Sequence, residues 1–180
     1  MKKVIENLKA GGVGVLRTDT LYGLLGLALN KETVEWIYFL KKRDPKKPLI
    51  VLISDLADLA FFGIRLSKEQ ALVLANIWPG KVSVVLPCAG KKFAYLHRGK
   101  NSIAFRLPKK KALIALLRRT GPLVAPSANP EKKRPARNIS EAKSFFGTLA
   151  DFYLADGTVI SNKPSRLIEL WKDGTIKTLR

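Results

Sequence analysis

The sequence has few of the residues from which metal centres, cross-links and catalytic triads are built. Its 180 residues include one cysteine, Cys88, and one histidine, His97. A single cysteine excludes an internal disulfide, and together the two residues leave no basis for a zinc site. His97 lies in a basic stretch, where we expect it on the surface rather than in a serine–histidine–aspartate triad. The sequence therefore argues against zinc-dependent and triad-type catalysis.

Acidic residues are scarce as well. The chain has 14 Asp+Glu against 33 Lys+Arg, which gives a formal net charge of +19 and a pI near 10.3. A charge of this size indicates a polyanionic partner, an anionic substrate or both, and a solvated basic surface without a partner is the alternative. No zinc finger, helix-turn-helix or RNA-recognition signature accompanies the charge. The charge alone therefore does not name a function.

Long apolar runs and glycine-rich phosphate loops are missing too. No apolar run approaches the roughly 20 residues that a membrane-spanning helix needs. Residues 1–9 alternate charged and apolar side chains at helical spacing, unlike a signal peptide. Neither Gly-x-x-x-x-Gly-Lys-Ser/Thr nor a Gly-x-Gly-x-x-Gly after a predicted strand occurs. We expect a cytoplasmic protein without membrane contact.

The pattern that is present is that of a mixed α/β domain. The length suits one domain over residues 1–180 with a sizeable core. Periodicity and capping residues predict helices over 2–10, 31–42, 68–77 and 109–119, with shorter ones from the caps Ser54 and Ser140 to 61 and 146. Apolar runs predict strands over 13–17, 49–53, 82–86, 103–107, 123–125, 151–155 and 166–171, and an Asp-Gly hairpin turn at 172–174 leads into 175–179.

Four polar clusters lie at the edges of these buried elements, where α/β proteins bind ligands. They are Thr18-Asp19-Thr20 with Tyr22, Lys42-Arg43 with Lys47, Ser102 with Arg106, and Ser127 with Asn129. Arg and Lys donate charge-assisted hydrogen bonds to phosphate and carboxylate groups. An arginine in the middle of an apolar strand needs an anionic partner, which for Arg106 is either Asp19 or a bound substrate. Residues 130–137 are basic and proline-bearing, which predicts a mobile loop.

The ordered set of motifs resembles the YrdC-like family, whose members include L-threonylcarbamoyladenylate synthases. The matching stretches are the segment 18–24, Lys41-Lys42-Arg43 through Lys47-Pro48-Leu49, Trp78-Pro79-Gly80, Ser102 to Pro108, and Ala125-Pro126-Ser127-Ala128-Asn129. One departure lies in the last of these, because the Ser-Gly that often follows in the family is Pro130-Glu131 here. The resemblance implies a single-domain twisted mixed sheet with flanking helices around a large basic cavity.

The resemblance also implies a reaction and a set of residues. The family joins L-threonine, bicarbonate and ATP into threonylcarbamoyl-AMP and pyrophosphate, a step toward N6-threonylcarbamoyladenosine in tRNA. By position, the expected catalytic residues are Arg43, Lys47 and Arg106. The expected nucleotide-binding residues are Lys42, Arg43, Lys47, Ser102, Ser127, Asn129 and Ser165, and Thr20, Arg106 and Ala125 are expected to line the threonine side. No protein ligand for a metal is expected, and Mg²⁺ is expected to accompany ATP.

Two other functions remain open from the sequence. The first is a YrdC-like module that binds double-stranded RNA or tRNA through its charge and has weak or no adenylate-forming activity. The second is the same chemistry on a substrate other than threonine, since Leu52 stands where some relatives have a threonine-contacting histidine and Arg166 follows Ser165. For the synthase, we expect RNA contact through the basic surface and transfer of the product to threonylcarbamoyl-transfer machinery.

Overall fold

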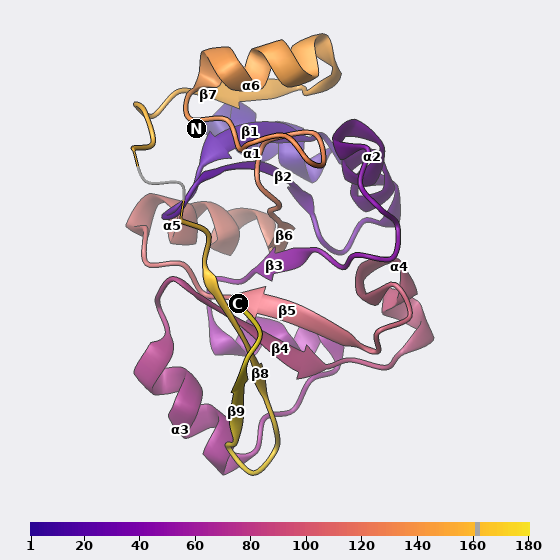
Figure 1. The fold of residues 1–180 in the computed structure, drawn as a ribbon, viewed down its shortest axis with the longest axis vertical. Helices are drawn as coiled ribbons and strands as arrows, with labels where there is room; N and C mark the ends of the chain where they lie inside the picture. Colours follow the sequence, from indigo (N-terminus) through magenta and orange to yellow (C-terminus); the bar gives the residue numbers. More distant parts are fainter. Residues whose placement is uncertain (161–162) are drawn as a thin grey trace.

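The computed structural model describes residues 1–160 and 163–180, which form one mixed sheet with helices on both faces (Figure 1). The strands, in spatial order, are β7 (Phe152–Leu154), β1 (Gly14–Arg17), β2 (Tyr22–Leu27), β6 (Leu123–Val124), β3 (Ile50–Leu52), β5 (Ser102–Arg106), β4 (Val82–Pro87), β8 (Arg166–Leu170) and β9 (Ile176–Thr178). The pairs β1–β7, β3–β5 and β4–β8 are parallel, and the other neighbours are antiparallel. The predicted mixed sheet with flanking helices is confirmed.

The predicted helices are present with small shifts. The helices of the structure are α1 (Lys2–Lys9), α2 (Lys31–Lys41), α3 (Lys68–Ile77), α4 (Ala94–His97), α5 (Lys111–Thr120) and α6 (Ile139–Phe146), with 3-10 turns over Leu56–Phe62, Lys91–Phe93 and Gly147–Leu149. Of these, α4 and the 3-10 turns over 91–93 and 147–149 were not predicted. The capping box of Ser67 with Gln70 is present as predicted. The cap of α6 is Asn138 rather than Ser140, and Asp55 rather than Ser54 caps the first 3-10 turn. In both cases the cap is the residue whose side-chain oxygen accepts a hydrogen bond from a main-chain N–H group.

Strand β2 was not predicted, and its presence changes the interpretation of residues 18–21, which precede it. Its glycines at 23 and 26 weaken the β-strand signal, because glycine adds no side chain to pack. Gly26 is required by the packing of α2, since a Cβ there would lie 2.4 Å from Thr33 Cγ2. Because β2 pairs antiparallel with β1, residues 18–21 form the turn of a hairpin rather than the free end of a strand.

Two hydrophobic clusters hold the helices to the sheet. On one face, α1 and α5 contribute leucine and isoleucine side chains that pack on β1, β2, β3 and β6. The larger cluster includes buried side chains of α2, α3 and α6 together with those of the sheet. With apolar layers on both faces, most positions of the central strands are buried, and β3 and β5 keep a few partly exposed positions that a ligand can reach.

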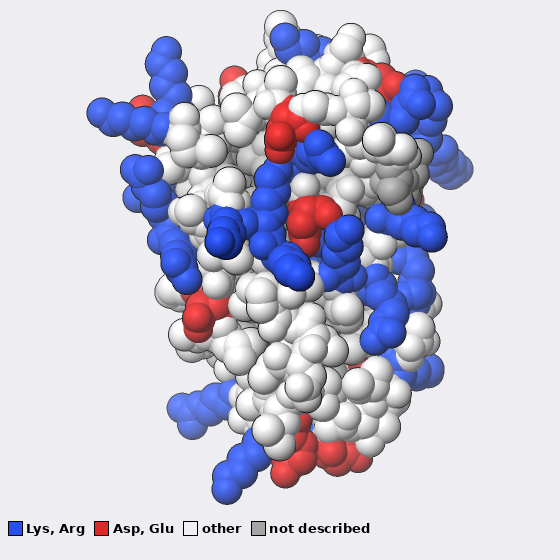
Figure 2. Space-filling model, turned by 90° about the vertical axis from the view of Figure 1, so that its left-hand side faces the viewer, with Lys and Arg blue, Asp and Glu red and all other residues white. Residues whose placement is uncertain are grey.

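Figure 2 shows lysine and arginine side chains across the upper and middle part of the face drawn and at its edges, with acidic groups among them and at the bottom. His97 was expected on the surface, and this was wrong: it is 4% exposed, and its Nδ1 accepts a hydrogen bond from the Gly99 N–H at 3.2 Å. Within the described ranges, no helix has the length and apolar character needed to cross a membrane.

Candidate active site

A cavity of about 450 Å³ opens at the ends of the central strands. Its walls come from the β1–β2 turn, the start of β3, the end of β5, the segment 125–135, Pro164-Ser165 and Arg180. In Figure 1 the C-terminus accordingly lies in front of the centre of the sheet. The size is in the range of ordinary ligand pockets. Four cationic side chains line it, namely Arg43, Arg106, Lys133 and Arg180.

The turn between β1 and β2 presents Thr20 to this cavity. Thr18 is buried, and its Oγ1 donates to the Leu21 carbonyl at 2.8 Å while accepting the N–H groups of Thr20 and Leu21 at 3.2 Å. The two threonine hydroxyls lie 3.1 Å apart. The Thr18 hydroxyl thus fixes the turn from inside, as threonine often does, and Thr20 becomes part of the wall.

Arg106 and Asp19 form a buried ion pair at the cavity. Arg106 Nη1 lies 2.6 Å from Asp19 Oδ1, and the two side chains are 4% and 6% exposed. Asp19 Oδ2 also accepts the Lys109 N–H at 3.1 Å. Burial lowers the pKa of Arg106 and the Asp19 carboxylate opposes that shift, so the guanidinium stays charged. Of the two partners left open by the sequence, Asp19 is the one present, and Arg106 Nε has no protein partner among the described residues.

The 43–48 turn is held by the side chain of Arg43. Arg43 Nε donates to the Lys47 carbonyl at 3.1 Å, and Nη2 donates to the Pro48 carbonyl at 2.9 Å. Tyr38 of α2 donates its hydroxyl hydrogen to the same Lys47 carbonyl at 2.8 Å. These bonds fix the guanidinium at the edge of the cavity, where its charge is available to an anion.

Lys41 holds in place the cavity wall that contains Ser127 and Asn129. The sequence did not single it out as a site residue. Its Nζ donates to the carbonyls of Ser127 and Asn129 at 2.5 and 2.6 Å, and the residue is 2% exposed. Burial, with a further contribution from Arg43, lowers the pKa of Lys41 to about 7. The available signal was its helical spacing from Val34, Ile37 and Tyr38, which places Lys41 on the buried face of α2. Lys42, which was singled out, ends the helix with an exposed side chain.

The remaining wall joins β8 to the C-terminal residue. Ser165 is buried, with its Oγ 2.8 Å from the Oγ of Ser83. Arg180 Nη2 donates to the Ser165 carbonyl at 3.3 Å. Sequence reasoning missed Arg180, because nothing in a basic terminal residue indicates that the hairpin carries it back to the cavity.

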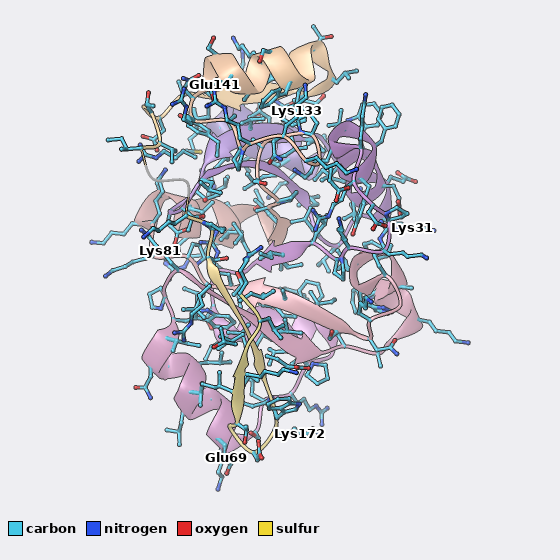
Figure 3. All side chains as sticks on the ribbon, viewed as in Figure 1. Lys31, Glu69, Lys81, Lys133, Glu141 and Lys172 are labelled. Carbon is cyan, nitrogen blue, oxygen red and sulfur yellow. The ribbon has the colours of Figure 1, made fainter. Side chains whose placement is uncertain are left out.

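The 130–137 segment is an irregular loop, as predicted, and several contacts hold it; its mobility stays a prediction. Asn129 Nδ2 donates to the carbonyls of Pro130 and Lys133 at 2.8 and 2.7 Å. Ala136 is buried, and the guanidinium of Arg137 donates from both Nε and Nη2 to Glu141 Oε1 at 3.1 and 3.0 Å. Figure 3 shows Lys133 on this segment beneath α6, which carries Glu141. Proline and charge indicated a loop, but not these anchors.

The structure brings most of the residues expected at the site together. The cavity lining includes Thr20, Arg43, Arg106, Ala125, Ser127, Asn129 and Ser165. Lys42, Lys47 and Ser102 lie outside the lining. Asn129 Oδ1 is buried without a protein partner among the described residues, which leaves an acceptor free at the cavity wall.

The donor set fits a phosphorylated ligand better than a protein-bound metal. No carboxylate lines the cavity, and no cluster of three or more His, Cys, Asp or Glu that could hold a metal occurs in the part of the chain that the structure describes. Guanidinium and ammonium groups bind phosphate oxygens directly. A Mg²⁺ ion at this site would therefore be held by the oxygens of the phosphate chain and by water.

Comparison with known proteins agrees with the fold and the motifs. The family model described as "Telomere recombination", for the Sua5, YciO and YrdC proteins, matches residues 6–180. The threonylcarbamoyl-AMP synthase of Marinobacter nauticus is 32% identical over 167 residues, which cover 92% of this chain and 88% of that protein. The synthase of Halorhodospira halophila is 32% identical over 152 residues, covering 84% and 80%.

Solved structures show the same fold. P. abyssi Sua5 complexed with L-threonine has a TM-score of 0.90 at 24% identity, covering 99% of this chain and 53% of that one. This chain thus spans about half the length of the P. abyssi protein. E. coli YciO has a TM-score of 0.85 at 22% identity, covering 99% and 86%. From the family match and the cavity that its motifs build, we conclude that the chain belongs to the Sua5/YciO/YrdC family.

Proposed function

We propose that this protein makes L-threonylcarbamoyl-AMP from L-threonine, bicarbonate and ATP, with release of pyrophosphate, as a step toward N6-threonylcarbamoyladenosine in tRNA. The observation that carries the proposal is the cavity itself, in which cations from four separate segments surround neutral donors and acceptors. Relatives that align over most of this chain carry the name threonylcarbamoyl-AMP synthase. Such an enzyme is a nucleotidyltransferase.

The proposed reaction balances without a protein nucleophile. The amine of threonine forms a C–N bond with the carbon of bicarbonate-derived CO₂, losing a proton, while water is the by-product of bicarbonate dehydration. An oxygen of the resulting carbamate then bonds to the α-phosphorus of ATP. The bond from that phosphorus to the bridging oxygen breaks, and pyrophosphate leaves with its electron pair. Positioning and neutralisation of phosphate charge supply most of the acceleration in steps of this kind.

The residues divide between the two substrates by their place in the cavity. Arg43 and Arg180 present guanidinium groups suited to the phosphate chain, with the hydroxyl of Ser127 nearby on the wall. Thr20 and Arg106 lie toward the β1–β2 turn, where Arg106 suits the carboxylate of an amino acid. Mg²⁺ bound to the phosphates would neutralise further charge on the leaving pyrophosphate.

Pyrophosphate release tests this proposal. The protein is incubated with ATP and Mg²⁺ in bicarbonate buffer, and each common amino acid is added singly. We expect release that requires both threonine and bicarbonate. Release with a different amino acid would keep the chemistry and replace the substrate. Absence of release with every amino acid, in folded protein, would contradict the proposal.

RNA contact is a second part of the proposal, and the surface charge favours it. The outer face of α5 carries Lys111, Arg118 and Arg119 as exposed side chains, and Figure 2 shows many basic groups on the face drawn. Each neutralised RNA phosphate releases a counterion, so binding should weaken steeply with salt. We expect the double variant R118Q/R119Q to lower tRNA affinity and its salt dependence while pyrophosphate release is unchanged. Equal affinity would contradict a role of α5.

The proposal also includes a partner that accepts the product and a location in the cell. The mixed anhydride product is reactive, so a threonylcarbamoyl-transfer machinery that accepts it is required for tRNA modification. The cytoplasmic location expected from the sequence agrees with a tRNA-modifying role and stays a prediction.

A further inference from the structure

The carboxylate of Glu131 binds two donors of the 43–47 turn. Its Oε1 lies 2.5 Å from Lys47 Nζ, and its Oε2 accepts the main-chain N–H of Asp44 at 2.6 Å. The main-chain N–H of Glu131 in turn donates to the Lys41 carbonyl at 2.7 Å. Each carboxylate oxygen therefore has its own donor, and the loop that begins at Asn129 is fastened to the end of α2.

These donors are the parts of an anion site. An ammonium group and a main-chain N–H both point at the same carboxylate group, and the guanidinium of Arg43 adds positive charge beside them. The hydrogen bonds from Lys47 and from the Asp44 N–H hold the pKa of Glu131 below its ordinary value, so the carboxylate is ionised at neutral pH. An anion contributed by the protein itself thus occupies the donors.

We propose that Glu131 is a positioning residue that stands in for a phosphate group and sets the affinity of the site for the phosphate chain of its nucleotide. The inference rests on the proposed function, which places Arg43 at that chain. Lys47 lies outside the cavity lining, on the same turn as Arg43, and the family resemblance leads us to expect it at the nucleotide. Lys47 Nζ cannot bind the chain at full strength while it is paired with Glu131, so the nucleotide must displace the carboxylate.

Displacement would act on the cavity wall. Glu131 belongs to the same segment as Lys133 and Pro135, which line the cavity. Release of the carboxylate removes one anchor of this segment, while the pair of Arg137 with Glu141 holds its other end. Because the site is competent only in the fraction of molecules with Glu131 released, the apparent dissociation constant is raised by the inverse of that fraction.

The test measures binding of inorganic tripolyphosphate by calorimetry, in the full chain at physiological salt. In E131Q we expect the dissociation constant to fall by about threefold to tenfold, because the competing charge is lost and Lys47 is freed. The matched control is E141Q, which changes the net charge equally and weakens the other anchor of the loop but leaves the 43–47 turn occupied. We expect its affinity to equal that of the wild type.

Three results would overturn the inference. They are unchanged or weaker binding in E131Q, equal tightening in E141Q, and absence of tripolyphosphate binding in both wild type and E131Q. Unfolding midpoints of all three proteins check that they are folded. This titration is independent of turnover, so failure of pyrophosphate release would contradict the proposed function without deciding the role of Glu131.

Steady-state kinetics gives a second readout that a merely structural role would not produce. We expect E131Q to lower the KM for ATP while kcat and the KM for threonine stay as in the wild type. A fall in kcat together with a rise in both KM values would show that Glu131 builds the site rather than competes for it.

Discussion

Replacing Arg106 by methionine tests the ion pair at the centre of the cavity. The change leaves the Asp19 carboxylate, whose side chain is 6% exposed, with the Lys109 N–H as its remaining partner. Removing one member of a buried ion pair costs about 3–5 kcal/mol. For a domain of this length, that corresponds to a fall of roughly 6–20 °C in Tm. We expect R106M to lose this stability and all threonine-dependent pyrophosphate release.

The double variant D19N/R106M separates stability from chemistry. With both charges removed, no unpaired charge remains in the buried site, so we expect it to regain about 2 kcal/mol or more relative to R106M. It should still be inactive, because the guanidinium that would bind the amino-acid carboxylate is gone. Urea unfolding and pyrophosphate release measure the two effects. R106M with wild-type stability and turnover would refute both the ion pair's role and the site assignment.

Three other changes test features of the wall and the sheet. K41M should abolish a rise in stability of about 1.36 kcal/mol per pH unit between about pH 7 and pH 10.5, measured by urea unfolding. The pKa of Lys41 is about 7 in the folded protein and 10.5 in its ordinary state, so the unfolded chain holds more protons in this window. An equal slope in the variant would refute this. G26A should cost about 1–3 kcal/mol of unfolding free energy, because its Cβ would meet Thr33 Cγ2 at 2.4 Å; a stable variant would contradict the packing. R180Q should raise the KM for ATP by about tenfold with the KM for threonine unchanged, and an unchanged KM for ATP would remove Arg180 from the nucleotide side.

The sequence predicted most of the helices and strands other than β2 and α4, because those elements depend on local signals. Seven of the ten residues expected at the site line the cavity. Apolar runs and caps are read within ten residues, and the family motifs fixed Thr20, Arg106 and Ser127 as neighbours before any geometry was known. The resemblance therefore supplied the long-range arrangement that local patterns do not contain.

The features that the sequence analysis missed depend mainly on contacts between residues far apart in the chain. Strand β2 has glycine at position 26 because α2 packs closely on it there, so a tertiary contact weakens the local strand signal. Lys41 and His97 are buried polar residues, and burial is decided by elements distant in the sequence. Arg180 reaches the cavity only because β8 and β9 return the chain to it. Apart from the helical spacing that places Lys41 on the buried face of α2, these features do not depend on a short window of sequence.

The cavity walls come from residues near both ends of the described chain, from Thr18 to Arg180. The complete binding site therefore exists only when these distant segments have come together, and closing the chain between them has an entropic cost. A ligand that binds here has no partial site to recognise in an unfolded or half-assembled chain. It stabilises the whole native sheet by mass action, and not one loop of it. Substrate supply would thus protect the newly made protein against global unfolding and proteolysis, in proportion to the logarithm of ligand concentration.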